Sequence, residues 1–288
     1  MEGGSPLPEL PEVESIKRIL NDCLVGKKIG GIKFFYTGML GGFSADDFAG
    51  QVRGRQILEI RRRGKYLHFC LDRDKILEVH LRMTGAFYFF PEGRPVDKYI
   101  RAIFFLKGGG ELHFRDIRKF GTFRLWDREI LDELNKRRLG PDPLENTCDF
   151  RLFMGILKRK PKSRLKAFLL DQKNLAGMGN IYTDEALFRA GLSPMCRVGA
   201  LGASDQVNLW QAIGDVLREG IEYGGVSVSS FENPYGHRGD FQDRLKVYRR
   251  EKEPFPRCGH EICRRVIAGR GTYFCPACQL DRKVSGYN

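Results

Sequence analysis

The hydrophobic pattern of the chain begins with one helix and continues with short strands. Residues 12–24 place apolar side chains every three or four positions, which predicts a helix, and Gly26 follows where that helix would end. From residue 29 to residue 126 the chain consists of short runs rich in β-branched and aromatic residues, separated by Gly, Asp and Pro. Several short strands with turns at this spacing predict a β-sandwich or barrel.

The pattern changes again after residue 140. The stretch Leu139–Asn146 contains the Pro, Gly and Asp of a linker, and from residue 149 to residue 224 the apolar spacing is helical. Residues 225–242 are polar and rich in Gly, which is typical of a mobile loop or of a loop that binds a ligand. Short strand-like pieces return after Leu245. We therefore expect a domain boundary near the linker.

The charge distribution indicates a polyanionic partner. The 288 residues carry a formal net charge of +13, and the basic residues concentrate in segments 53–65, 151–180 and 241–288. A solvated surface would mix its signs, so these patches favour nucleic acid, with a basic protein that binds none as the alternative. No apolar run approaches the roughly 20 residues that span a bilayer, and no secretory signal is visible. We expect no membrane partner and a cytoplasmic, bacterial nucleoid-associated location.

Half of the eight cysteines crowd into the tail. Four thiolates can close a tetrahedral zinc site, which stabilises hairpins with too little core to fold alone. The spacing of the second pair is typical of zinc ligands, whereas that of the first pair is at the edge of the usual range, and His260 is a candidate substitute. Cysteines unrelated to metal are the alternative. The predicted ligands of a structural zinc ion are Cys258, Cys263, Cys275 and Cys278.

Two turns in basic surroundings are candidates for phosphate contact. Arg270 lies between two glycines at a predicted hairpin tip, where Gly adds no bulk and lets a ligand backbone approach. Residues 171–182 join two helical stretches through glycines that permit a double turn. The next helix begins near Asn180, where backbone N–H groups are suited to a phosphate. Such turns are common without DNA, so each signal alone is moderate.

Three further residues gain a candidate role from their surroundings. Met83 and Phe120 would be ordinary core residues by type, yet each follows a strand-like run in a basic, turn-like context. An apolar wedge in such a place can enter a base stack. Lys65 follows three arginines and a glycine, and would otherwise be a solvated surface residue.

The whole chain resembles the formamidopyrimidine-DNA glycosylase/endonuclease VIII family, and within it the formamidopyrimidine (8-oxoguanine) branch. The matching strings occur in the family's order: PELPEVE, RRRGKYL, HLRMTG, FRDIRKFG, LLDQKNLAGMGNIYTDEALFRAG, GGVSVSSF, GDFQDRLKVYRR and VIAGRGTYFCPACQ. The resemblance implies an α+β fold with an N-terminal β-sandwich domain, a helical helix–two-turn–helix domain and a C-terminal zinc-finger β-hairpin. The expected segments are a prefix at 1–7, a catalytic β-sandwich domain at 8–140, a helix–two-turn–helix DNA-binding domain at 141–242, and a zinc-finger hairpin and tail at 243–288.

The resemblance also implies a chemistry. The protein would be a bifunctional DNA glycosylase and AP lyase of base-excision repair, which excises oxidised purines (8-oxoguanine, formamidopyrimidines) and cuts the strand by β,δ-elimination. Pro8, N-terminal in the family, would attack C1′ of the flipped nucleotide and form a Schiff base, with Glu9 as the acid/base. Lys65 would assist β-elimination and grip phosphate. Arg270 would bind phosphate and assist δ-elimination.

The implied partner is double-stranded damaged DNA, bound by a monomer. A base inside the duplex cannot be reached, so the nucleotide is extruded and the gap is filled. Met83, Arg118 and Phe120 match the residues that fill the gap, with Arg118 reading the opposite cytosine. Lys166 and Asn180 match positions that bind the DNA backbone.

Two departures from the family pattern affect binding residues. The family's first zinc cysteine falls three residues before Cys258, where this chain has Phe255. Cys258 then matches the second ligand and Cys263 is a displaced replacement, with a metal-free finger as the alternative. The family's histidine-containing stretch before the fifth strand lacks its histidine here, and Tyr99 or Arg101 would donate to phosphate instead.

The third departure is the segment Met1–Leu7 in front of Pro8. A proline nitrogen inside a chain is a tertiary amide and cannot attack C1′, whereas a free secondary amine can. Either Pro8 is freed, because the segment is a misassigned start, a cloning remnant or a protease substrate, or the segment stays. If it stays, the protein would be a monofunctional glycosylase or a non-lyase protein that binds lesions or abasic sites. We expect a free Pro8, because Glu9, Lys65 and Arg270 suit chemistry that needs it.

Overall fold

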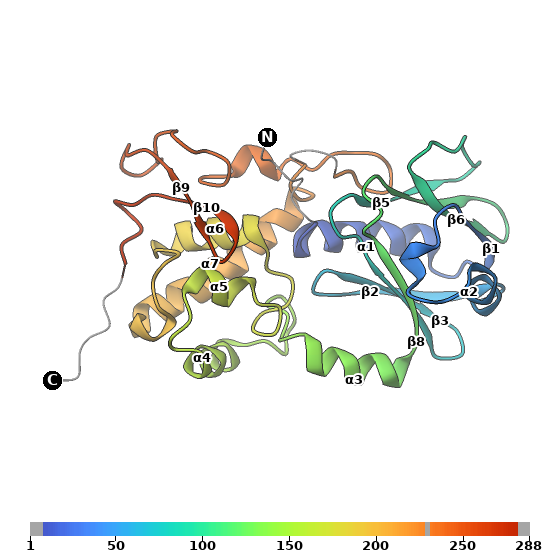
Figure 1. The fold of residues 1–288 in the computed structure, drawn as a ribbon, viewed down its shortest axis with the longest axis horizontal. Coiled ribbons are helices and arrows are strands. Elements are labelled where there is room, and N and C mark those ends of the chain that lie inside the picture. Colours follow the sequence, from blue (N-terminus) through green and yellow to red (C-terminus); the bar gives the residue numbers. More distant parts are fainter. Residues whose placement is uncertain (1–7, 228–230, 282–288) are drawn as a thin grey trace. The chain divides into compact units, whose positions relative to one another are not determined.

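The computed structural model describes residues 8–227 and 231–281, and the expected prefix 1–7 lies outside these ranges. The chain forms two compact units (Figure 1). Unit 1 runs to Arg137 and also takes in Tyr223–Gln242, whereas unit 2 contains Arg138–Glu222 and the chain from Asp243 onward. The chain therefore leaves unit 1 and returns to it once.

Unit 1 is the β-sandwich that the strand pattern predicted. Aromatic rings from both of its sheets meet in the core. The Phe87 ring centre lies 5.6 Å from that of Phe69 and 5.1 Å from that of Phe114, and Phe114 lies 4.8 Å from Phe123. One antiparallel sheet has the order β1 (Ile29–Phe34), β6 (Ile100–Leu106), β7 (Glu111–Asp116), β5 (Gly85–Phe90), and the other has the order β2 (Ile57–Arg63), β3 (Tyr66–Leu71), β4 (Lys75–His80), β8 (Thr122–Asp127).

The first helix, α1 (Leu10–Leu24), confirms the prediction for residues 12–24 and begins two residues earlier. The earlier start arises because Glu9 and Glu12 form a capping box, which satisfies N–H groups that the first turn leaves without partners. Its apolar side chains are buried in the core of unit 1, as their spacing requires. Further helices in this part of the chain are a 3₁₀ turn (Gly38–Leu40), α2 (Ala45–Val52) and α3 (Arg128–Arg138).

Residues 223–227 and 231–242, here called the return segment, belong to unit 1, although we expected them in the helical domain. One reason is a hydrogen bond of 2.8 Å from the Val226 N–H to Glu12 Oε1 on α1. The chain passes so close to α1 that a Cβ at Gly225, where φ is +87°, would lie 2.8 Å from the same oxygen. Contacts between residues so far apart in sequence leave no trace in the hydrophobic pattern.

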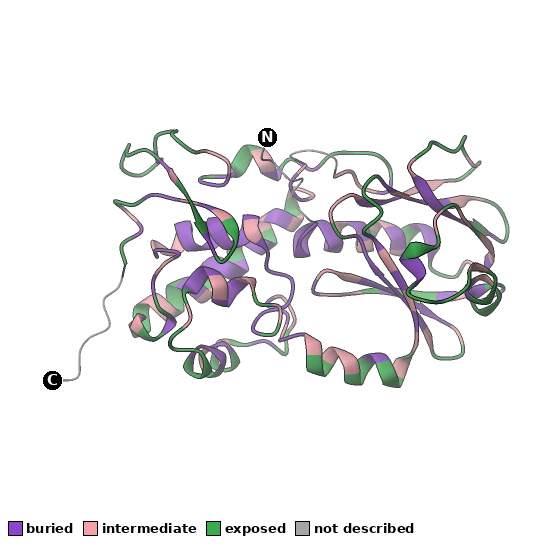
Figure 2. Cartoon of the chain, viewed as in Figure 1, coloured by how far each residue is buried: buried purple, intermediate pink, exposed green. Residues whose placement is uncertain are grey.

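Unit 2 is helical and ends in a two-stranded hairpin, as the sequence predicted. The buried Glu185 carboxylate accepts the backbone N–H groups of residues 246–248 at 2.9–3.0 Å, and burial raises its pKa. Figure 2 shows that α6, which carries Glu185, is buried along most of its length. No helix within the described ranges is long and apolar enough to cross a membrane. The elements are α4 (Phe150–Arg159), α5 (Leu165–Leu170), α6 (Asn180–Ala190), a 3₁₀ turn (Val198–Ala200), α7 (Ala203–Glu222), a 3₁₀ turn (Phe241–Arg244) at the boundary with unit 1, β9 (Cys263–Ile267) and β10 (Arg270–Phe274).

A side chain at Gly239 should loosen the return segment. A Cβ there would overlap the carbonyl oxygens of Gly224 and Gly225, so Gly239→Ala must push two stretches of backbone apart. We expect unit 1 to lose about 1–3 kcal/mol in its free energy of unfolding, the range for overpacking. Hydrogen exchange at the Val226 N–H should become faster. Gly50→Ala is the control, because α2 has open space there, and equal effects of the two substitutions would contradict the prediction.

Candidate active site and DNA interface

The residues in front of α1 are held by the helix that they begin. Pro8 and Glu9 are both buried. The Glu9 N–H donates to Glu12 Oε2 at 2.8 Å, and the Glu9 carboxylate accepts the Glu12 N–H. The N-terminal end of a helix also carries partial positive charge, which favours carboxylates there. Glu9 therefore has a fixed position next to Pro8.

Lys65 lies in a two-residue turn between β2 and β3. Arg63 and Tyr66 are the last pair of the two strands, and Gly64 takes φ +55°, which suits the first position of such a turn. Arg62 Nη1 donates to Gly64 O at 3.1 Å. The half-buried Lys65 is thus carried on a short, hydrogen-bonded turn.

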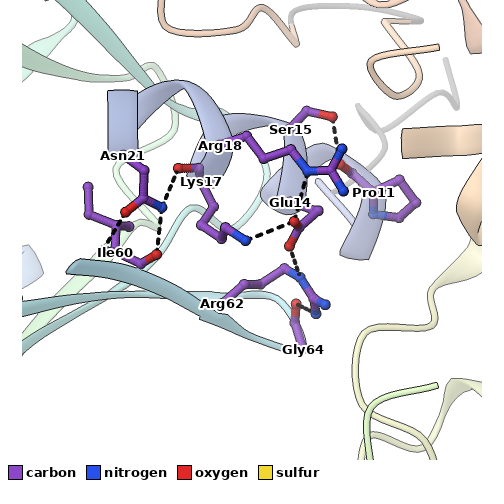
Figure 3. Close-up of polar contacts among 9 residues, drawn as sticks. All are labelled: Pro11, Glu14, Ser15, Lys17, Arg18, Asn21, Ile60, Arg62 and Gly64. Carbon is purple, nitrogen blue, oxygen red and sulfur yellow. Dashed lines mark hydrogen bonds and ion pairs between the residues drawn. The ribbon is translucent and has the colours of Figure 1, made fainter. Parts of the chain in front are cut away.

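Figure 3 shows how this turn is bound to α1. Arg62 Nε donates to Glu14 Oε2 at 3.0 Å, with 7% and 10% of the two side chains exposed. Glu14 also accepts Lys17 Nζ at 2.9 Å and Arg18 Nε at 3.0 Å. Burial alone would raise the pKa of Glu14, but the hydrogen bonds from these three basic side chains outweigh it and lower the pKa below its ordinary value. The charged pair fixes the Lys65 turn relative to α1.

A second buried carboxylate arranges two surface loops. Asp116 at the end of β7 is 1% exposed. Its Oδ1 accepts the Thr84 hydroxyl and, at 3.2 Å, the Arg118 N–H. Its Oδ2 accepts the Gly121 N–H at 2.7 Å. One side chain therefore fixes both the loop after β4 and the loop after β7.

The three residues predicted to fill the gap come together on these loops. Arg118 Nη1 lies 2.9 Å from Met83 Sδ, and the Arg118 guanidinium lies 4.8 Å from the centre of the Phe120 ring. The Phe120 side chain is 50% exposed. A thioether, a guanidinium and an aromatic ring thus lie side by side, which is the chemistry of a wedge that enters a base stack.

Tyr99 and Arg101, the residues predicted to donate a hydrogen bond to a DNA phosphate, differ in their surroundings. Tyr99 is half-buried, with the Arg115 guanidinium 4.8 Å from its ring centre. Arg101 is buried, and its guanidinium donates to Asp116 O at 2.8 Å and to Lys98 O at 2.9 Å. Arg101 therefore supports the end of β7 in this structure. A contact of either residue with phosphate stays a prediction.

Unit 2 carries the predicted backbone-binding residues Lys166 and Asn180. Lys166 is fully buried, and its Nζ donates to Asp184 Oδ1 at 2.5 Å and to Asn180 O at 3.3 Å. Asp184 Oδ2 accepts the N–H of Tyr273 on β10 at 3.0 Å. This geometry gives Lys166 a positioning role inside unit 2 and does not favour its direct contact with phosphate.

Arg270 follows the two-residue turn between β9 and β10. Ala268 and Gly269 in that turn take φ +53° and +70°, as a type I′ turn requires. The Arg270 side chain is exposed. Asn180 Nδ2 donates to Gly271 O at 2.9 Å, so the start of α6 and the Arg270 turn lie together in unit 2.

The tail cysteines form a cluster of three rather than four. The Sγ atoms of Cys258, Cys275 and Cys278 lie within 4.8 Å of one another. Thiolates on one tetrahedral zinc ion lie about 3.8 Å apart, so these three fit the ion as structural ligands. A hydrogen bond with Cys278 lowers the pKa of the Cys258 thiol to about 7, which favours the thiolate. Cys263, the expected fourth ligand, is outside this cluster, with its Sγ 4.0 Å from Glu261 O.

Sequence reasoning missed the buried acids that organise these sites. Glu12, Asp116 and Asp184 each fix two segments, yet a single acidic residue has no periodic signature and is usually solvated. One signal was available: Glu9 and Glu12 have the spacing of a capping box in front of an apolar run.

Comparison with known proteins gives one consistent family. Family models match three stretches of the chain: the formamidopyrimidine-DNA glycosylase N-terminal domain at residues 7–123, the formamidopyrimidine-DNA glycosylase H2TH domain at 139–232, and the zinc finger found in FPG and IleRS at 256–280. Formamidopyrimidine-DNA glycosylases of Desulfitobacterium hafniense and Heliobacterium modesticaldum are 42% and 43% identical to this chain, over 95% of its length and 100% of theirs.

Solved structures of the same family share the fold. Lactococcus lactis Fpg in complex with DNA that contains an abasic site has a TM-score of 0.87 at 36% identity, with 95% of this chain and 100% of that chain covered. The MutM (Fpg) protein of Thermus thermophilus has a TM-score of 0.83 at 41% identity, with 94% and 98% covered.

The buried Asp184 should make the stability of unit 2 depend on pH. Burial raises the pKa of Asp184 from 3.8 to about 6, although Lys166 opposes the shift. The folded chain therefore holds this proton more tightly than the unfolded chain. The contribution of Asp184 to the free energy of unfolding is full below about pH 4, falls as the pH rises to about 6, and is constant above that.

The measurement is urea unfolding of unit 2, followed by Trp210 fluorescence in a Trp126→Phe background. It compares the wild type with Asp184→Asn from about pH 4 to about pH 7, the window in which only the wild-type side chain titrates. The free energy of unfolding of the wild type minus that of the variant should fall across the window. A rise would contradict the assignment.

Proposed function

The chain belongs to the formamidopyrimidine-DNA glycosylase family and is a DNA glycosylase and AP lyase of base-excision repair, and we propose that it excises oxidised purines from double-stranded DNA. The substrate class is supported by Lactococcus lactis Fpg, whose structures include complexes with DNA that contains Fapy-dG. The observation that carries the proposal is the start of α1, where Glu9 is fixed next to Pro8 and α1 is bound to the turn with Lys65.

In the proposed reaction Pro8 is the nucleophile. Its free amine forms a bond to C1′ of the extruded nucleotide while the bond from C1′ to the base breaks, and the base leaves with a proton. Glu9 handles the proton transfers that open the sugar and give the Schiff base, a role that its fixed place at the N-cap supports. Lys65 then assists β-elimination, and Arg270 assists δ-elimination and holds a phosphate.

The extruded nucleotide leaves a gap in the duplex, which we assign to Met83, Arg118 and Phe120. The contacts among the three side chains and the exposure of Phe120 support this assignment. Asn180 would bind the DNA backbone from the start of α6, with Lys166 holding that start in position. We further propose that the protein acts as a monomer at the bacterial nucleoid, because its net charge of +13 attracts it to DNA.

We propose that the active form begins at Pro8. The match to the N-terminal family model starts at residue 7, which supports the assignment of Pro8 to the catalytic proline. The alternative is a monofunctional glycosylase or a non-lyase binder of lesions and abasic sites, which follows if residues 1–7 stay attached. An amide nitrogen cannot form the Schiff base, so only the form with a free Pro8 amine can bond covalently to C1′ of the DNA.

Borohydride trapping distinguishes them. Protein whose mass confirms Pro8 as its first residue should give a covalent adduct with duplexes that contain 8-oxoguanine or an abasic site, since borohydride reduces a Schiff base to a stable amine. The matched control is the same chain with Met1–Leu7 attached, which should give none. A missing adduct from the confirmed Pro8 form would rule out the lyase mechanism.

Phe120→Ala should lower the affinity of the protein for a duplex from which a base has been lost or extruded. Loss of aromatic stacking costs about 1–3 kcal/mol per base, so binding to an abasic-site duplex should fall about 5- to 150-fold, with the melting temperature unchanged. Phe35→Ala is the control, because Phe35 is an exposed phenylalanine of the same unit outside the two loops, with 43% exposure against 50% for Phe120. Equal losses for both variants would refute the role of Phe120.

A further inference from the structure

A group of exposed basic side chains on unit 2 has no acidic partner. Two stretches of the chain, 150–170 and 186–204, contain no Asp or Glu at all. None of the exposed basic residues of this group takes part in an ion pair of the described residues. The group consists of Lys158, Arg159, Lys160, Lys162, Arg164 and Arg197.

The backbone of unit 2 holds two of these cations against each other. Arg164 and Arg197 lie opposite each other on antiparallel stretches, and hydrogen bonds of 2.8 and 2.9 Å between their neighbours join the stretches. This is the non-hydrogen-bonded kind of pair, in which the side chains lie closer together. The Arg164 side chain does not cap α5, which begins after it. Like charges directly opposite each other destabilise such a pair, so the arrangement has a cost that no described acid offsets.

The arginine pair lies near the hairpin that carries Arg270. Nη1 of the exposed Arg265 lies 3.9 Å from the sulfur of Met195, which is two residues before one of the paired arginines. Arg265 and Ile267 are two positions apart on β9, and Ile267 pairs with Arg270. Arg265 and Arg270 therefore share one face of the hairpin. Basic side chains thus continue from the predicted phosphate contact at the hairpin turn to the arginine pair.

We propose that Arg265, the arginine pair and the basic residues at 158–160 and 162 form a second DNA-contact surface, which binds phosphates of the duplex that flanks the lesion. Duplex DNA carries one negative charge per about 1.7 Å of its axis, so a row of unpaired cations fits it and releases its counterions. Phosphate contacts do not read bases, so this surface raises the affinity for any duplex and holds the protein on DNA during its search. The inference rests on the proposed function, but it concerns binding and not the covalent reaction.

The salt dependence of duplex binding by the full-length chain tests this surface. The double variant Arg164→Gln, Arg197→Gln should make the slope of log affinity against log salt concentration shallower by about 1.8, or about 0.9 for each cation. The ratio of wild-type to variant affinity should therefore rise about 60-fold when the salt concentration falls tenfold. The loss should be equal for an undamaged duplex and for a duplex with an abasic site. An unchanged slope, or a loss confined to the abasic duplex, would overturn the proposal.

Two further double variants separate local contact from net charge and from folding. Lys136→Gln with Arg218→Gln removes the same net charge, but from cations that already have an acidic partner on their own helix. Its slope should stay close to that of the wild type, and a change equal to that of the first variant would refute a local surface. Arg164→Lys with Arg197→Lys keeps the charge and should keep the slope, whereas a loss as large as with glutamine would show that charge is not the cause. The glutamine pair should melt no lower than the wild type, because opposed like charges are gone.

Equilibrium binding needs no covalent step, so this test is independent of borohydride trapping. A shallower slope in the glutamine pair, together with no adduct from the confirmed Pro8 form, would support the surface and refute the lyase mechanism. An adduct together with an unchanged slope would do the reverse.

Discussion

A carboxylate removed from water is unfavourable unless hydrogen-bond donors surround it, and this chain meets that condition where its functional segments join. Glu12 accepts N–H groups from Glu9 and from Val226 of the return segment. Asp116 accepts the Thr84 hydroxyl from the loop after β4 and the Gly121 N–H from the loop after β7. Glu185, which lies on α6, accepts N–H groups from the segment in front of the hairpin. Each carboxylate is stabilised only when the segment that donates its hydrogen bonds is in place. Hydrogen bonds to buried acids therefore position these segments, together with apolar packing.

The basic residues of the chain have two different tasks. Arg62 and Lys166 are directed inward, where each neutralises a buried acid and fixes a turn or a helix start. Arg118 and Arg270 are exposed on a loop and a hairpin, and these are the ones available to DNA. A buried charge must be paired, whereas an exposed one keeps its hydration and can exchange it for a phosphate. Net charge alone does not separate the two groups.

Hydrophobic periodicity predicted the helices and strands well, but it did not predict which side chains contact one another. The helix at 12–24, the sandwich and the tail hairpin each have a repeating pattern that a sequence displays. Lys166 was expected to bind the DNA backbone because it matches a family position, and only the fold brings Asp184 next to it. Cys263 has an acceptable spacing in sequence, but spacing does not report where the thiol lies, and in the fold it is outside the cluster of the other three. The missing information is therefore long-range contact.

The bond between Glu12 and Val226 joins residues that are 214 positions apart. During synthesis at the usual 5–20 residues per second, Val226 follows Glu12 by roughly 10 to 40 s. Throughout that interval the nascent chain has α1 and then the sandwich, but Glu12 lacks the donor that the return segment supplies. The start of α1 is therefore completed only after most of the protein has been translated. A truncated chain that ends before the return segment would fold a sandwich in which Glu12, at the start of α1, lacks the hydrogen bond from Val226.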